Sequence, residues 1–324
     1  MRKYLLNTNT YIRTQILFEL WPSRKWQPVL LTDSMKKILV LISLLFLLCN
    51  FSKSQDTDVK NKSKEKPFLL GIIDTIQSSL LSETRAINIY LPEGYSPDSA
   101  STYPVIYLLD GGGDEDFIHI VGLVRYFNQP WINRFPKSIV VGIASVNRRK
   151  DFTFATPNLD FVGRMGFDKS AFTSYGGSEK FISFIEKELQ PFIEKNCKTN
   201  LSKTIIGESL GGLLATEILL KKPKLFNTYI IISPSLWWGK ESLLKEAPQL
   251  LKTNSEHKIK VYVGAANKEE SIIMYDDAKE LEQTLKKYGG DKVEVSFDYL
   301  SNETHATIIH QAVYNAFKLL YPAK

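Results

Sequence analysis

Residues 207–212 read Gly-Glu-Ser-Leu-Gly-Gly, which is the pattern of a serine nucleophile held at a tight turn. An apolar run (204–207) precedes Ser209 and an amphipathic stretch (210–221) follows it, as a strand–turn–helix requires. The turn strains the serine backbone, and the glycines let strand and helix approach closely. The helix start offers free N–H groups to a developing oxyanion. We therefore predict acyl transfer by Ser209; the alternative is a bystander serine in an ordinary strand–helix turn.

The general base for such a serine is expected to be a histidine that follows it in the chain. The order serine, acid, histidine is typical of enzymes with this turn. The chain has four histidines, at positions 119, 257, 305 and 310. His305 lies between an apolar run (293–300) and the last amphipathic stretch (306–320), whereas His310 falls one turn inside that stretch. The sequence therefore predicts His305 as the base.

The acid is expected on the loop after the apolar run 258–264, which reads Ala-Ala-Asn-Lys-Glu-Glu. Glu269 is the first candidate and Glu270 the second. For both, the alternative is a solvated helix start, where acidic residues are favoured. Asp276, Asp277 and Glu303 remain open as acids, and so does a Ser–His dyad without an acid.

A glycine-rich turn, Asp-Gly-Gly-Gly-Asp at residues 110–114, follows the apolar run 105–110. Glycine lets backbone N–H groups approach a ligand without a Cβ in the way. We expect this loop to supply one oxyanion donor, and Leu210, the residue after the nucleophile, to supply the other. A simple flexible loop is the alternative.

Seven apolar runs and five amphipathic stretches must position these residues. The predicted strands are residues 86–91, 105–110, 139–144, 204–207, 229–233, 258–264 and 293–300, and the predicted helices are residues 178–196, 210–221, 240–250, 272–288 and 306–320. Several strands are continuous Val/Ile/Leu/Tyr runs, typical of strands buried on both faces of a parallel sheet. This alternation predicts one doubly wound α/β domain over residues 68–324. Residues 147–177 lack periodicity and are expected to form a long functional loop.

The positive charge of the chain is concentrated near its N-terminus. The 324 residues carry a net charge of +6, and residues 1–54 hold eight basic and two acidic side chains. Residues 55–324 therefore hold 33 of each sign. Without a bulk charge on the body we expect no nucleic-acid partner. The ordinary globular composition argues against a disordered, collagen-like or disulfide-scaffold protein.

Residues 35–54 have the organisation of a secretory signal peptide: Met-Lys-Lys, an apolar run over 38–49, and small residues before Gln55. The run is about a dozen residues long, whereas a bilayer span needs roughly 20, so a membrane anchor is the weaker interpretation. We predict export to the periplasm or the medium, with Met35 as the true start and residues 1–34 as upstream misannotation. Lipidation at Cys49 is the alternative. The polar residues 55–67 are expected to form a flexible linker.

The sequence gives no sign of a metal or an organic cofactor, because it lacks clustered His/Cys ligand spacing. Cys197 is the only cysteine after the predicted signal peptide, so no internal disulfide is expected. A domain of this size buries enough core to fold without one.

Four pieces of the chain resemble the esterase family that includes esterase D and the bacterial siderophore esterases. They are residues 103–111 (Tyr-Pro-Val-Ile-Tyr-Leu-Leu-Asp-Gly), residues 207–212, residues 233–238 (Ser-Pro-Ser-Leu-Trp-Trp) and His305. The resemblance covers most of residues 68–322 and implies a single-domain α/β-hydrolase fold. It also implies that Ser209 is the nucleophile, that His305 is the general base and acid, and that Gly112 and Leu210 are the oxyanion donors. Many members carry histidine where Glu208 stands here.

Two features near the predicted site indicate a class of substrate. Trp237 and Trp238 follow a strand at its C-terminal end, where α/β sheets bind ligands, and could stack on catecholate groups; core packing is the alternative. Arg148, with its two basic neighbours, could pair with an anionic ferric catecholate; a solvated turn is the alternative. We therefore expect a serine esterase that acts on a small-molecule siderophore ester. A feruloyl or acetyl-xylan esterase and a non-catalytic binding protein on the same fold remain open, as does the oligomeric state.

Overall fold

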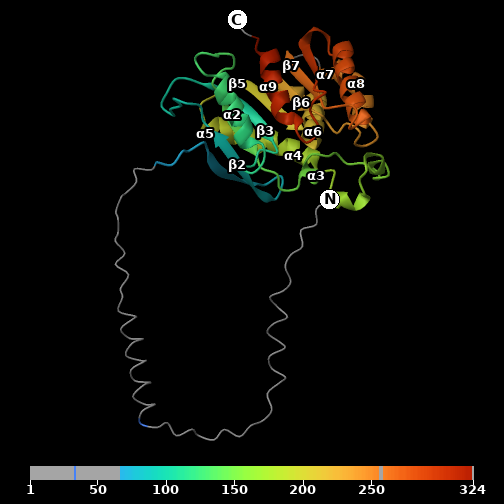
Figure 1. The fold of residues 1–324 in the computed structure, drawn as a ribbon, viewed down its shortest axis with the longest axis horizontal. Coiled ribbons are helices and arrows are strands. Elements are labelled where there is room, and N and C mark those ends of the chain that lie inside the picture. The colour runs from blue at the N-terminus through green and yellow to red at the C-terminus, as the bar shows by residue number, and fades with distance from the viewer. Residues whose placement is uncertain (1–32, 34–65, 255–257, 323–324) are drawn as a thin grey trace. The chain divides into compact units, whose positions relative to one another are not determined.

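A computed structural model of the chain describes residue 33, residues 66–254 and residues 258–322. The chain divides into two units, Met1–Lys66 and Pro67–Lys324 (Figure 1). The predicted signal peptide (35–54) and residues 55–65 of the predicted linker lie outside the described residues, so both stay predictions. Within the described part of the chain, every helix is too short or too polar to cross a membrane.

One eight-stranded sheet forms the centre of the described part of Pro67–Lys324, in the order β1-β2-β4-β3-β5-β6-β7-β8. β2 pairs with β1 and β4 in antiparallel fashion, and all other pairs are parallel. The strands are β1 (Ile72–Ser78), β2 (Glu83–Tyr90), β3 (Tyr103–Leu109), β4 (Ile139–Ile143), β5 (Thr199–Glu208), β6 (Thr228–Ile232), β7 (Ile259–Ala265) and β8 (Val293–Tyr299). Every residue of β4 and β6 is buried, as expected for apolar strands covered on both faces.

Helices cover both faces of this sheet (Figure 1). They are α2 (Phe117–Phe127), α3 (Arg148–Asp151), α4 (Ser178–Phe184), α5 (Gln190–Asn196), α6 (Leu210–Lys221), α7 (Ser242–Asn254), α8 (Ile272–Tyr288) and α9 (Ile308–Leu320). One hydrophobic core includes apolar residues of α2 and α9, and the other includes those of α4 to α8. Strand β3 contributes side chains to both cores. Tyr107 and Leu109 lie in the core with α4 to α8, and Leu108 lies in the core with α2 and α9. The alternation follows from the two-residue period of a strand.

The sequence predictions of fold class and strands are confirmed. The sheet is mostly parallel with helices on both faces, the α/β-hydrolase arrangement, and each of the seven predicted strands is present. The edge strand β1 was not predicted, because its sequence, Ile-Ile-Asp-Thr-Ile-Gln-Ser, is exposed at four of seven positions and lacks the continuous apolar signal. Residues 147–177 are not wholly irregular, since they contain α3 and two 3-10 turns, Val162–Met165 and Lys169–Phe172. The predicted helix 178–196 contains a π turn at Ile185–Leu189.

A buried ion pair fixes the start of this segment against the sheet. Arg85 of β2 is 1% exposed and contacts the carboxylate of Asp151 in α3 at 2.5 Å, and it also contacts Glu83. Asp151 is itself only 2% exposed. Because α3 spans only four residues, this contact also determines where Arg148 lies.

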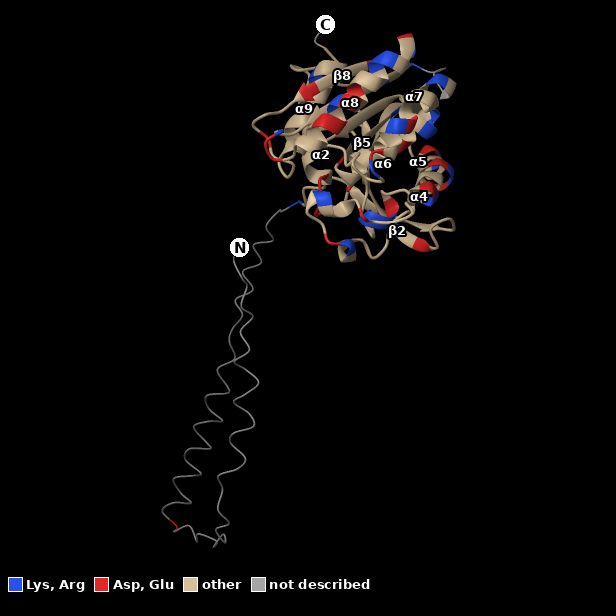
Figure 2. Ribbon diagram, turned by 90° about the vertical axis from the view of Figure 1, so that its right-hand side faces the viewer, with Lys and Arg blue, Asp and Glu red and all other residues tan. Residues whose placement is uncertain are grey.

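Charged residues of both signs alternate along the outer helices. Figure 2 shows basic and acidic residues side by side on α4, α7 and α8. The side in view has no extended region of one sign, which agrees with the balanced charge of residues 55–324.

Candidate active site

Ser209 occupies a strained turn between β5 and α6. Its backbone angles are φ 58° and ψ −117°, a positive φ that a residue with a side chain rarely adopts. Gly207 before the serine and Gly211 after it pack closely against each other. A Cβ on Gly207 would lie 2.4 Å from the carbonyl oxygen of Gly211, so this turn requires glycine at position 207. The Ser209 N–H donates to Ile232 O at the end of β6 (3.0 Å). The turn therefore holds the serine at the C-terminal edge of the parallel sheet.

A second serine, Ser235, lies against Ser209. The two Oγ atoms are 3.3 Å apart, and the Ser235 N–H donates to the Ser209 carbonyl oxygen (2.9 Å). Ser235 is 2% exposed. Sequence reasoning missed this neighbour, although it belongs to the Ser-Pro-Ser-Leu-Trp-Trp segment, because only strand order reveals that β6 lies beside β5.

His305 reaches this edge from the loop between β8 and α9. Its Nε2 lies 3.7 Å from Oε1 of Glu208, the residue before the nucleophile. Among the described residues, none hydrogen-bonds its buried Nδ1, and none of the hydrogen bonds joins His305 to Ser209. Burial lowers the pKa of His305, Glu270 opposes this, and Arg148 adds to it. The imidazole is therefore neutral at neutral pH, as a general base must be.

The candidate acids Glu269, Glu270 and Glu303 differ in the groups that they contact. Oε2 of Glu270 accepts a hydrogen bond from the His305 backbone N–H (2.6 Å), whereas the exposed Glu269 donates its own N–H to Asn267 Oδ1 (2.9 Å). Glu303 binds the hydroxyl of Thr307. The structure thus brings the second candidate, Glu270, to the histidine and leaves the first, Glu269, in solvent. Adjacent residues of a loop point in different directions, which the sequence could not resolve.

The remaining acids lie on α8 and differ in environment. Asp277 is 6% exposed, and burial, opposed in part by Arg164, raises its pKa to about 7. Asp276 precedes it on the same helix. Neither carboxylate contacts His305 within the described residues.

In the predicted oxyanion loop, the backbone N–H of Gly112 already has a hydrogen-bond partner. The N–H of Gly112 donates to Oε2 of Glu115 at 2.6 Å, so this amide is not free for a substrate oxygen in this conformation. That corrects the expectation for Gly112. The sequence did not reveal it because the acceptor is a side chain that folds back over its own loop. Leu210 begins α6, where the first N–H groups have no partner within the helix.

Arg148 joins three elements at the same edge. Its Nε donates to both carboxylate oxygens of Asp110 at 2.9 Å, and its Nη2 donates to the backbone oxygen of Glu208 at 3.0 Å. It therefore ties α3 to the ends of β3 and β5. The side chain is 32% exposed, so the guanidinium serves the framework of the site and offers only part of its surface to a ligand.

Trp237 and Trp238 are part of the hydrophobic core. They are 3% and 0% exposed, and the Trp238 indole N–H donates to Phe154 O (2.9 Å). Phe161 and Phe172 pack on Trp238 with ring centroids 5.2 Å and 5.1 Å away. The prediction that these indoles offer a stacking surface to a substrate is therefore wrong for this conformation. The segment 147–177 covers them, and a strand-end position alone does not reveal such a cover.

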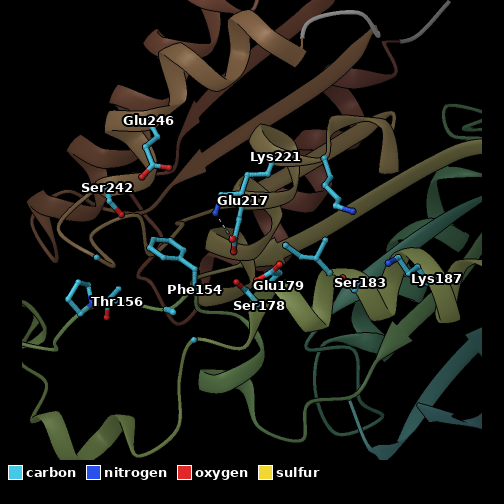
Figure 3. A pocket seen from close by; sticks show the side chains of 16 residues that line it. Phe154, Thr156, Ser178, Glu179, Ser183, Lys187, Glu217, Lys221, Ser242 and Glu246 are labelled. Carbon is cyan, nitrogen blue, oxygen red and sulfur yellow. Dashed lines mark hydrogen bonds and ion pairs between the residues drawn. The ribbon is translucent and has the colours of Figure 1, made fainter. Parts of the chain in front are cut away.

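A cavity of about 860 Å³ lies elsewhere, between α4, α7 and the C-terminal half of α6 (Figure 3). Its lining includes Phe154, Ser178 and Glu217 but neither Ser209 nor His305. Glu217 follows Ser209 by eight residues, which is roughly 12 Å along a helix axis. This cavity is therefore separate from the candidate active site.

The site brings together groups that acyl transfer requires. The described residues contain no group of three or more His, Cys, Asp or Glu side chains placed to hold a metal ion. A strained serine, a neutral histidine and a helix N-terminus at the C-terminal edge of a parallel sheet define a serine hydrolase of the α/β-hydrolase fold.

Comparison with known proteins places the chain within this class. The family model described as "Putative esterase" matches residues 78–298, and the chain belongs to that family and is an esterase. The chain is 30% identical over 287 residues to the ferri-bacillibactin esterase BesA of Bacillus subtilis, covering 83% of this chain and 97% of BesA.

Solved structures agree with the family assignment. An IroE-like serine hydrolase from Shewanella oneidensis has a TM-score of 0.71 and 30% identity, over 78% of this chain and 80% of its own. The BES protein from Bacillus cereus has a TM-score of 0.68 and 27% identity, over 80% of this chain and 99% of its own.

Proposed function

We propose that this protein is an exported serine esterase that hydrolyses ester bonds of catecholate siderophores. The observation that carries the proposal is the strained Ser209 at the sheet edge, with the neutral His305 on the neighbouring loop. The similarity to BesA, a ferri-bacillibactin esterase, supports the substrate class.

The reaction follows from the roles of these groups. Ser209 Oγ attacks the ester carbonyl carbon while His305 accepts its proton, and His305 returns this proton to the leaving alcohol. Water then hydrolyses the acyl-enzyme by the same proton route. The N–H of Leu210 and the dipole of α6 stabilise the oxyanion. His305 and Ser209 must come within about 2.6–3.2 Å for this transfer, a contact that often tightens only when substrate binds.

Hydrolysis of p-nitrophenyl acetate by the wild type and by Ser209→Ala tests the nucleophile. We expect kcat to fall by about 10³-fold or more in the variant, because the covalent step is lost. Full activity in the Ser209→Ala protein would overturn the assignment.

A comparison of two ester substrates tests the proposed substrate class. A catecholate trilactone and a feruloylated sugar are offered to the wild type at equal concentrations. We expect a higher kcat/KM for the trilactone. A preference for the sugar ester would identify a feruloyl-type esterase, and turnover of no ester at all would favour a binding protein on this fold.

Export is proposed from residues 35–54. N-terminal sequencing of the mature protein from the extracellular or periplasmic fraction tests it. We expect the mature chain to begin near Gln55, and peptides from residues 1–34 in that fraction would contradict the proposal.

A further inference from the structure

Glu208, the residue before the nucleophile, faces the histidine. Its Oε1 lies 3.7 Å from Nε2 of His305, and its side chain is 19% exposed. Glu208 takes no part in the acyl-transfer steps carried out by Ser209 and His305. A carboxyl group this close to the nitrogen that must accept the serine proton affects that nitrogen directly.

Within the described part of the chain, no cation is hydrogen-bonded to the Glu208 carboxyl group. Arg148 donates to the backbone oxygen of Glu208 and to the carboxylate of Asp110. Burial raises the pKa of Glu208 to about 8; Arg148 opposes this rise, and Asp110 and Asp116 add to it. Among the described residues, these three groups and His305 are the charged or titratable groups that face Glu208, from the end of β3, the start of α2, α3 and the loop before α9. Glu208 therefore keeps its proton through neutral pH.

The protonation state of Glu208 decides which nitrogen of a neutral imidazole carries hydrogen. A carboxylate only accepts hydrogen bonds, so an ionised Glu208 favours a proton on the facing Nε2. That tautomer leaves Nε2 without the lone pair needed to accept a proton from Ser209. A protonated Glu208 presents an O–H donor to Nε2, which favours hydrogen on Nδ1 and leaves Nε2 with its lone pair.

Among the described residues, no acid binds Nδ1 of His305 to hold hydrogen on that nitrogen. In serine hydrolases an acid bonded to Nδ1–H holds the productive tautomer. Here Glu270 binds the His305 backbone N–H, and among the described residues Nδ1 has no partner. Glu208 is thus the carboxyl group that contacts the ring in this conformation.

We propose that Glu208 is a positioning residue that sets the tautomer of His305, and that the esterase is active only while the Glu208 carboxyl group is protonated. The inference rests on the proposed role of His305 as the base. It adds an alkaline limit to the activity, in addition to the acid limit that protonation of His305 imposes.

The test is the pH dependence of kcat/KM for p-nitrophenyl acetate in the wild type, Glu208→Gln and Glu269→Gln, with Ser209→Ala as the background control. We expect wild-type and Glu269→Gln activity to fall about tenfold per pH unit above pH 8, because one proton is lost. Glu208→Gln cannot ionise, so its kcat/KM stays level to about pH 9.5. An alkaline fall in Glu208→Gln equal to that of the wild type overturns the proposal.

A spectroscopic measurement keeps the proposal testable if Glu208→Gln is inactive. ¹⁵N-histidine NMR of Ser209→Ala and of Ser209→Ala/Glu208→Gln reports the His305 tautomer without turnover. We expect Nε2 of the first protein to gain hydrogen as the pH rises through 8, and Nε2 of the second to remain unprotonated. The same tautomer in both proteins at every pH overturns the proposal. This result is independent of whether siderophore esters are substrates.

Discussion

The carboxylate of Glu270 accepts a hydrogen bond from the backbone N–H of His305 at 2.6 Å. This contact joins the loop after β7 to the loop before α9, 35 residues apart in the chain. A carboxylate acceptor makes the bond stronger than one between neutral groups. Glu270 therefore determines where the backbone of the candidate base lies, and its charge also acts on the imidazole.

Replacing Glu270 by glutamine is expected to impair the base. A hydrogen bond to a charged group contributes about 1.5–3 kcal/mol, so its loss lowers kcat/KM roughly 10- to 100-fold. Glu270 also raises the pKa of His305, so the acid limb of the pH profile shifts to lower pH in Glu270→Gln. Steady-state kinetics from about pH 5 to 8 measure both effects. The control, Glu269→Gln, should match the wild type, and equal losses in the two variants would refute this role.

Replacing Gly207 by alanine is expected to distort the turn that holds Ser209. The new Cβ would meet the Gly211 carbonyl oxygen at 2.4 Å, and backbone on both sides must move. We expect a destabilisation of about 1–3 kcal/mol and a fall in kcat of at least about tenfold. Urea denaturation and p-nitrophenyl acetate hydrolysis measure these quantities. Gly113→Ala is the control, because a Cβ there meets nothing within 4 Å. Wild-type kinetics in Gly207→Ala would contradict the steric argument.

Replacing Asp151 by alanine is expected to destabilise the fold. Among the described residues, it leaves the 1%-exposed Arg85 with only the partly exposed Glu83 as an ion-pair partner. Breaking a buried pair costs about 3–5 kcal/mol, and the remaining Glu83 contact places the expected value near the lower end. The urea midpoint measures the change. Asp160→Ala removes a carboxylate from the exposed pair with Lys169 and should leave the midpoint nearly unchanged. Similar midpoints for the two variants would show that burial does not decide the cost.

Stability is expected to fall in mild acid because of a histidine pair between α2 and α9. His310 Nε2 lies 3.1 Å from His119 Nδ1. Burial lowers the pKa of His310, His119 adds to this, and Asp116 and Glu303 oppose it. The unfolded chain, with a histidine pKa of about 6.5, therefore binds more protons than the folded chain as the pH falls. The stability contribution is complete above about pH 6.5 and is lost below it.

Melting temperatures of the wild type and His310→Gln at about pH 5 and pH 8 check this prediction. The variant should lose less stability between pH 8 and pH 5. Some loss should remain, because the pKa of His305 is also lowered. An unchanged difference between the two pH values would rule out the histidine pair as the source.

The sequence alone determined the order of strands and helices along the chain and the turn at Ser209. Continuous apolar runs that alternate with amphipathic helices are typical of buried strands. Glycines beside a serine at a strand–helix junction permit a close approach that other residues prevent. These signals are local, and the structure retains them as β2 to β8 and as the positive φ of Ser209. The position of His305 after the last strand also follows from chain order.

Only the tertiary structure decided which side chains meet at the sheet edge. Glu270 contacts the His305 backbone and Glu269 does not, Glu115 binds the Gly112 amide, and residues 147–177 bury Trp237 and Trp238. Each outcome depends on the direction of a loop side chain or on a segment distant in the chain. Residue types and periodicity report the local face of an element, whereas burial and hydrogen bonding at a loop depend on what packs against it.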